Sequence, residues 1–101
     1  MEGKDVKKGY WVVAYRSVGD ESALKEYGKL AVPAIQAGGG RSLIRTAEVE
    51  ARESGVNQRI VVTEFDSLEK AIATYNSAAY EAARRVLGSG VERDFRIVEG
   101  V

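Results

Sequence analysis

The nine residues Gly9-Tyr-Trp-Val-Val-Ala-Tyr-Arg-Ser17 decide the fold of this chain. Aromatic and β-branched residues are enriched in this stretch, which is typical of a β-strand. Alternate residues of a strand point to opposite faces of a sheet. Both sets of alternate residues are apolar here: Tyr10, Val12 and Ala14 on one side, and Trp11, Val13 and Tyr15 on the other. Both faces of the sheet therefore need cover, and helices of one small chain can cover only one of them.

The stretch that follows changes to helical spacing. Apolar residues recur every three or four positions, which predicts a helix over 21–37 with Asp20 as its N-cap. Pro33 lies inside this helix and predicts a kink or a break there. The glycines at 38–40 end it, because glycine accepts the backbone conformations that close a helix.

The rest of the chain gives two strands, a broken helix and a last strand. Asp66 and Glu69 have the spacing of a capping box. The predicted elements are strands over 41–53 and 58–65 that form a hairpin, a helix from Asp66 that is interrupted at Asn76-Ser77, its second piece over 78–87 with Ser77 as the N-cap, and a strand over 91–101.

The order β-α-β-β-α-β predicts an α+β, ferredoxin-like fold, with a four-stranded antiparallel sheet and both helices on one face. We expect one domain over 9–101, preceded by a flexible leader over 1–8. The uncovered apolar face predicts a homodimer in which two sheets pack face to face. The alternative is that loops or the leader cover this face.

Composition excludes several classes of function. The 101 residues contain 15 Lys and Arg, 15 Asp and Glu, no His and no Cys. A neutral chain offers no general attraction for nucleic acid or an anionic membrane. Without Cys or His, thiol catalysis, Cys-ligated zinc and a Ser-His-Asp triad are excluded, and we predict neither metal nor cofactor. The sequence shows no signal peptide and no apolar run long enough to span a membrane, so we expect a soluble cytoplasmic protein.

Short motifs are spread over residues 9–101. They are Gly9-Tyr10-Trp11-Val12, Lys25-Glu26-Tyr27, Pro33, Gly39-Gly40-Arg41, Leu43, Arg45, Val61-Val62-Thr63-Glu64-Phe65-Asp66-Ser67, Tyr75-Asn76-Ser77-Ala78-Ala79-Tyr80 and Ile97-Val98-Glu99-Gly100-Val101. In order and spacing they resemble domain of unknown function family 1330. The resemblance implies a dimeric α/β barrel, in which two ferredoxin-like protomers join their sheets and a pocket often forms between sheet and helices. It implies no particular activity, so whether the protein is an enzyme stays open.

Charged residues inside the apolar strands are the first candidates for chemistry. We expect Arg16 and Glu64 near the same end of the sheet, on strands taken as parallel neighbours. A buried charge needs a partner, so one hypothesis is an ion pair between them. In a second, Glu64 is a catalytic acid or base with a raised pKa inside a pocket. In a third, both are simply exposed at strand ends.

Two arginines of the second strand are candidates for binding an anion. Arg41 and Arg45 are four residues apart, so a regular strand would place them on one face. Paired guanidinium donors could bind a carboxylate or a phosphate. Alternatively, they pair with Glu48, Glu50 or Glu99 at the surface or an interface.

Tyr27, Tyr75 and Tyr80 lie on helix faces expected to cover the sheet. Their hydroxyls could line a small cavity, with Asn76 at the helix break contributing a polar group, or they could be core residues. The predicted function is a small dimeric protein with a small-molecule pocket between sheet and helices in each protomer. The alternatives are a cofactor-independent enzyme, monooxygenase-like or isomerase-like, and a non-catalytic structural or regulatory dimer.

Overall fold

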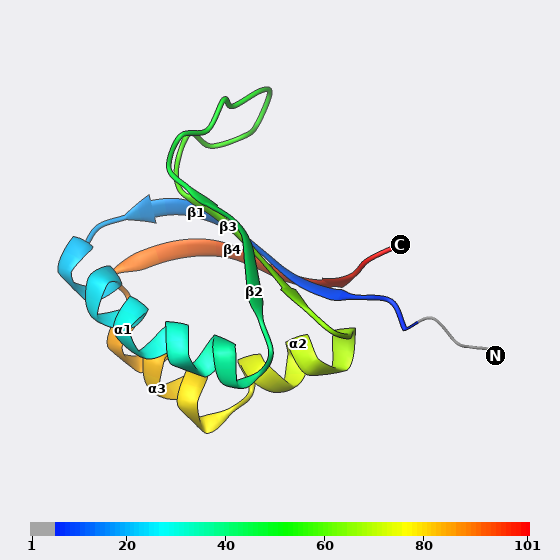
Figure 1. The fold of residues 1–101 in the computed structure, drawn as a ribbon. Coiled ribbons are helices and arrows are strands. Elements are labelled where there is room, and N and C mark those ends of the chain that lie inside the picture. Colours follow the sequence, from blue (N-terminus) through cyan, green and yellow to red (C-terminus); the bar gives the residue numbers. More distant parts are fainter. Residues whose placement is uncertain (1–5) are drawn as a thin grey trace.

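The computed structural model describes residues 6–101, so residues 1–5 of the predicted leader lie outside the described part (Figure 1). Its elements are β1 (Gly9–Val18), α1 (Glu21–Ala37), β2 (Arg41–Thr46), β3 (Ile60–Phe65), α2 (Leu68–Tyr75), α3 (Ala78–Leu87) and β4 (Val91–Glu99). The predicted order is confirmed, with the second helix present as two pieces. No helix within residues 6–101 is long and apolar enough to cross a bilayer.

The four strands form one sheet in the order β2-β3-β1-β4, and every neighbouring pair is antiparallel. All three helices lie on the same face of this sheet (Figure 1). The ferredoxin-like prediction is therefore confirmed. β1 occupies a central position between β3 and β4, which explains why both of its faces are apolar.

The second strand is shorter than predicted. Pairing between β2 and β3 ends at Thr46 opposite Ile60, and residues 47–59 form a loop that stands away from the sheet (Figure 1). The alternation of charged and small residues in this loop resembles a half-exposed strand. The loop residues would bury too little apolar surface in a strand to compensate for the conformational entropy lost on ordering them.

Two helix starts follow the predicted caps. The Asp20 carboxylate accepts a hydrogen bond from the Ala23 amide at 3.0 Å, and Ser77 Oγ accepts one from the Tyr80 amide at 3.2 Å. Each satisfies an amide that the helix itself leaves free. Pro33 lies inside α1 without ending it. Its exposed position leaves the freed carbonyl of the preceding turn accessible to water.

The predicted cap of α2 is one residue off. Ser67, not Asp66, caps the helix, because its Oγ accepts from the Lys70 amide at 3.1 Å. The Asp66 carboxylate is engaged elsewhere, accepting from Arg41 Nη2 at 3.1 Å. The capping box with Glu69 is therefore wrong.

Trp11 anchors the core between sheet and helices. Its indole N–H donates to the Ala71 carbonyl of α2 at 2.9 Å, which ties β1 to that helix. Its ring lies 5.0 Å from Phe65, 4.8 Å from Tyr80 and 5.2 Å from Phe95, measured between centroids. Aromatic rings at such separations add to the stabilisation from burial alone.

The opposite face of the sheet carries apolar residues in a row across the strands. Ile44 of β2 is opposite Val62 of β3, and Val62 is opposite Val12 of β1. We call this side the open face. Ile44 is 44% exposed there, and Val98 on β4 is 42% exposed.

Candidate functional site: a cavity beneath the first helix

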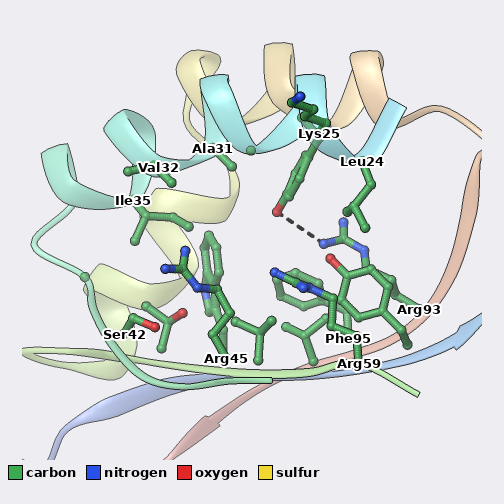
Figure 2. A pocket seen from close by; sticks show the side chains of 18 of the residues that line it. Leu24, Lys25, Ala31, Val32, Ile35, Ser42, Arg45, Arg59, Arg93 and Phe95 are labelled. Carbon is green, nitrogen blue, oxygen red and sulfur yellow. Dashed lines mark hydrogen bonds between the residues drawn. The ribbon is translucent and has the colours of Figure 1, made fainter. Parts of the chain in front are cut away.

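A cavity of about 540 Å³ lies between α1 and the helix-covered face of the sheet (Figure 2). α1 forms its roof, and all four strands contribute to its floor. Its principal lining residues are Trp11, Val13, Tyr15, Leu24, Lys25, Tyr27, Gly28, Ala31, Val32, Ile35, Ser42, Arg45, Arg59, Val61, Thr63, Arg93 and Phe95. The cavity places apolar side chains and several cations around one space.

Small residues on the underside of α1 keep this space open. Gly28 and Ala31 both line the cavity. A Cβ added to Gly28 would meet no atom within 4 Å. Larger side chains at these two positions would bring the roof's own atoms into the cavity.

Strand register brings three arginines to one part of the floor. Arg45 of β2 is opposite Val61 of β3, and Arg93 of β4 is opposite Tyr15 of β1. Arg59 precedes β3, and its carbonyl accepts from the Tyr15 amide at 2.9 Å. All three side chains rise from the sheet toward α1 (Figure 2).

One side of the cavity ends in a buried hydroxyl pair. The hydroxyl oxygens of Tyr27 on α1 and Tyr80 on α3 lie 2.5 Å apart. Arg93 Nη1 donates to the Tyr27 hydroxyl at 3.2 Å, the dashed line of Figure 2, and lies 3.5 Å from that of Tyr80. Burial, and next the neighbouring Tyr80, raises the pKa of Tyr27, so this phenol is neutral at physiological pH.

The guanidinium groups also lie against aromatic rings. Arg93 lies 5.7 Å from the centroid of Tyr15 and 5.0 Å from that of Phe95, while Arg59 lies 6.0 Å from Tyr15. Cations within about 6 Å of a ring face are attracted to it. The buried Nε of Arg59 has no hydrogen-bond partner among residues 6–101.

Of the predicted residues, Tyr27 and Arg45 line this cavity. Tyr80 is fully buried beside Tyr27 and does not line it. The structure places Tyr75 in the core, where the Arg84 guanidinium lies 4.6 Å from its ring centroid. Tyr75 faces a separate hollow of about 290 Å³. Asn76 is exposed at the C-cap of α2 and lines neither space.

Glu64 lies on the open face, away from the cavity. Its carboxylate accepts from the Tyr10 hydroxyl at 2.9 Å and from Arg41 Nε at 3.1 Å. These two hydrogen bonds, that of Tyr10 first, lower the pKa of Glu64. The hypothesis of a raised-pKa acid or base in a pocket is therefore not supported by the place or the pKa of Glu64.

The expected ion pair between Arg16 and Glu64 is wrong. β1 and β3 are antiparallel, not parallel, and it is Tyr10 that lies opposite Glu64. Arg16 lies near the other end of β1, where its Nη2 is 3.7 Å from the Asp94 carboxylate.

The expected shared face of Arg41 and Arg45 is also wrong. β2 shifts register between Ser42 and Ile44, so Leu43 is an extra residue that forms a bulge. Arg41 consequently lies opposite Glu64 on the open face, whereas Arg45 lines the cavity. Arg41 pairs with Glu64 and Asp66 rather than with Glu48, Glu50 or Glu99.

Sequence reasoning missed Arg59, Arg93 and Gly28. One signal was present for Arg93, which precedes Phe95 and Ile97 by even steps and so shares their face of the last strand. Gly28, in the middle of a helical pattern, is a costly choice for helix stability alone. Arg59 has a similar signal in the predicted strand over 58–65, because it precedes Val61 and Thr63 by even steps.

Comparison with known proteins adds the family. The sequence profile described as a domain of unknown function, DUF1330, matches residues 8–101. The chain belongs to the DUF1330 family. No curated protein matches the DUF1330 chain by sequence.

Solved structures similar to the DUF1330 chain share its fold. A Rhodopseudomonas palustris protein of unknown function has a TM-score of 0.73 at 13% identity, over 94% of this chain and 83% of its own. A Nitrosomonas europaea protein, provisionally named an antibiotic biosynthesis monooxygenase, has a TM-score of 0.60 at 18% identity, over 93% and 98%. A NIPSNAP family protein from Agrobacterium tumefaciens has a TM-score of 0.61 at 14% identity, over 100% and 92%. At these identities the likeness extends to the fold and not to activity.

Proposed function

We propose that this DUF1330 protein binds a small organic molecule in the cavity between α1 and the sheet. The cavity itself carries the proposal, because a hollow of about 540 Å³ lies between α1 and the sheet. Small-molecule sites have volumes of roughly 300–1,000 Å³, mostly apolar walls and a few polar groups that fix orientation. Val13, Ala31 and Phe95 supply such walls here, and Arg93 with Tyr27 supplies polar groups.

We propose binding at this cavity and no catalytic reaction. Glu64, the candidate for acid or base chemistry, faces away from the cavity. Among the described residues that line the cavity, the one carboxylate is that of Glu21, at the start of α1. A cofactor-independent enzyme, monooxygenase-like or isomerase-like, has no specific observation in its favour beyond the name of a distant structural neighbour.

We further propose that two copies pack their open faces together as a homodimer in the cytoplasm. The row from Ile44 through Val62 to Val12 gives an apolar centre to this face. Ion pairs lie on either side of it, Arg41 with Glu64 and Arg96 with Asp94. An apolar centre with a polar rim is the usual composition of a protein–protein interface.

The cavity is tested with a substitution that fills it. Gly28→Leu places a large side chain into the open space below α1, and Ala79→Leu, on the exposed face of α3, is the matched control. A panel of small organic acids, amides and alcohols is screened by thermal shift, and hits are measured by calorimetry. We expect binding by the natural chain and by Ala79→Leu, and its loss in Gly28→Leu. Binding that persists in Gly28→Leu would place the ligand elsewhere and contradict the proposal.

The dimer is tested separately by light scattering at micromolar concentration. Val62→Arg puts a charge into the centre of the open face, and Val86→Arg puts one on the outer side of α3, where Val86 is already 40% exposed. We expect a dimer for the natural chain and for Val86→Arg, and a monomer for Val62→Arg. A monomeric natural chain would refute the dimer and leave the cavity proposal untouched.

A further inference from the structure

We infer that the ligand of this cavity is an organic anion whose carboxylate is held by the floor arginines and whose apolar body lies beneath α1. This inference rests on the proposed binding function and specifies its ligand. Its starting point is the charge of the cavity wall. Four cations line the cavity, namely Lys25, Arg45, Arg59 and Arg93, against the single carboxylate of Glu21.

These cations lack anionic partners within the described part of the chain. Seven other basic side chains of residues 6–101 form ion pairs with carboxylates, among them Arg41 and Arg96. Lys25, Arg45, Arg59 and Arg93 form none with the carboxylates of those residues. Arg93 instead donates to the hydroxyls of Tyr27 and Tyr80, which are neutral acceptors.

Of the four cations, Arg59 gives the strongest support for an anionic ligand. It is partly buried, its Nε is cut off from water, and no protein group of residues 6–101 accepts from that Nε. A buried donor without an acceptor costs free energy, and an unpaired buried charge costs more. The cation–π contact of Arg59 with the ring of Tyr15 supplies no hydrogen-bond acceptor. A negatively charged acceptor inside the cavity would supply both the missing hydrogen-bond acceptor and the missing opposite charge.

The register of the sheet places the three arginines near one another. Arg59, just before β3, and Arg93 of β4 lie on either side of Tyr15, and Arg45 lies on β2, beyond β3. Guanidinium groups have a planar fork of donors that matches the two oxygens of a carboxylate. Like charges that line one cavity repel each other, and an anion bound between them would reduce this repulsion.

The apolar part of the cavity wall indicates the chemistry of the rest of the ligand. Leu24, Val32 and Ile35 of α1 line the cavity above Phe95 of the floor (Figure 2). Val13 of β1 adds a further apolar side chain to the lining. Such a surface gains nothing from a fully hydrated inorganic anion, but it removes an aliphatic or aromatic group from water. The structure therefore favours an organic carboxylate over inorganic phosphate.

Matched pairs of ligands test this inference. Benzoate with benzamide, 2-naphthoate with 2-naphthamide, and octanoate with octanamide each differ mainly in charge. Binding of all six and of inorganic phosphate is measured by calorimetry at neutral pH, on the natural chain and on Arg45→Gln and Arg59→Gln. Circular dichroism confirms that both variants fold, and Arg85→Gln, on the outer side of α3, is the control for losing one positive charge.

We expect at least one carboxylate to bind about ten-fold or more tightly than its amide, since hydrogen bonds to charged groups are stronger than neutral ones. This preference should fall in Arg45→Gln and Arg59→Gln and remain in Arg85→Gln. If an acid and its amide bound equally well, and both lost binding in Gly28→Leu, the inference that the ligand is an anion would be overturned. The proposal that the cavity is the binding site would remain. Phosphate binding as tightly as the best carboxylate would overturn the apolar body. Absence of binding by every probe, together with a negative result in the wider panel, would overturn the proposed function itself.

A ligand-free measurement separates a binding role from a structural one. If Arg59 binds the ligand, Arg59→Leu should raise the melting temperature of the empty protein, because a buried Nε donor without an acceptor is removed from a partly apolar site. A fall in melting temperature on Arg59→Leu would show that Arg59 stabilises the fold and would overturn its assignment to the ligand.

Discussion

Arg93 on the last strand reaches the hydroxyl of Tyr27 on the first helix at a distance of 3.2 Å. Tyr80 completes the contact from α3, so a single hydrogen-bonded group joins three elements. The bonded atoms lie between the sheet and both helices and beside the cavity. This group therefore links α1 to the floor of the cavity through Tyr27 and Arg93.

Removing either hydroxyl should weaken the fold by a modest amount. We expect Tyr27→Phe and Tyr80→Phe each to lower the free energy of unfolding by about 1 kcal/mol, the usual net value of one hydrogen bond. The double variant should lose less than the sum, because the two hydroxyls share one bond. Urea unfolding of all four proteins measures this. Strict additivity would show that the hydroxyls do not interact in solution.

Stability should fall at alkaline pH through Tyr27. Burial first, and the neighbouring Tyr80 next, raises the pKa of Tyr27 above its ordinary value of 10.0. The folded chain therefore holds the phenol proton more tightly than the unfolded chain does. The resulting stabilisation is complete below pH 10.0 and is lost as the pH rises above it.

The measurement is urea unfolding from about pH 8 to about pH 11, around the ordinary pKa of tyrosine. We expect the fall in stability above the ordinary pKa to be shallower in Tyr27→Phe than in the natural chain. Tyr15→Phe is an informative second variant, because burial raises the pKa of that tyrosine as well. Identical pH profiles for the natural chain and Tyr27→Phe would rule out a raised pKa at this position.

Acid should weaken the network around Glu64. Hydrogen bonds from Tyr10 and then Arg41 lower the pKa of Glu64 below its ordinary 4.5. The stabilisation they give is present above pH 4.5 and is lost as the pH falls through the lowered value in the folded chain. Glu64→Gln should flatten this acid limb in urea unfolding. Glu69→Gln, on the exposed side of α2, is the control and should leave it unchanged.

Gly28→Ala should stabilise the protein. Alanine is favoured over glycine in a helix interior by about 1 kcal/mol, and the added methyl group meets no atom within 4 Å. The gain should appear as a higher urea midpoint with an unchanged slope. By contrast, Gly38→Ala should destabilise, because the new Cβ would lie 2.0 Å from Thr74 Oγ1.

The sequence was enough to predict the order of the elements, because β1 is apolar on both faces and the change to helical spacing after Asp20 is clear. The caps at Asp20 and Ser77 followed from the same local rules, and the structure confirms both. The cap of α2 did not. Asp66 and Ser67 are both good caps, and only the tertiary contact of Asp66 with Arg41 shows why Ser67 takes the role.

The cavity was predictable as a place but not as a set of residues. Tyr27 and Arg45 were among the candidate residues, and both line it. Arg59 lies outside the β3 ladder. Its position at the site is fixed by the hydrogen bond from the Tyr15 amide to the Arg59 carbonyl. Contacts of this kind depend on the register of strands far apart in sequence, which local patterns do not contain.

The extra residue at Leu43 has a consequence for comparing this chain with its relatives. Arg41 and Arg45 are an even number of residues apart and yet serve opposite sides of the sheet. In a relative whose β2 has the same length but no bulge, the residue aligned with Arg41 would turn inward beside the one aligned with Arg45. An ungapped alignment would then equate an outward-facing position with a ligand-facing one. Loss of the bulge would thus move the residue aligned with Arg41 from the open face to the cavity without changing its identity.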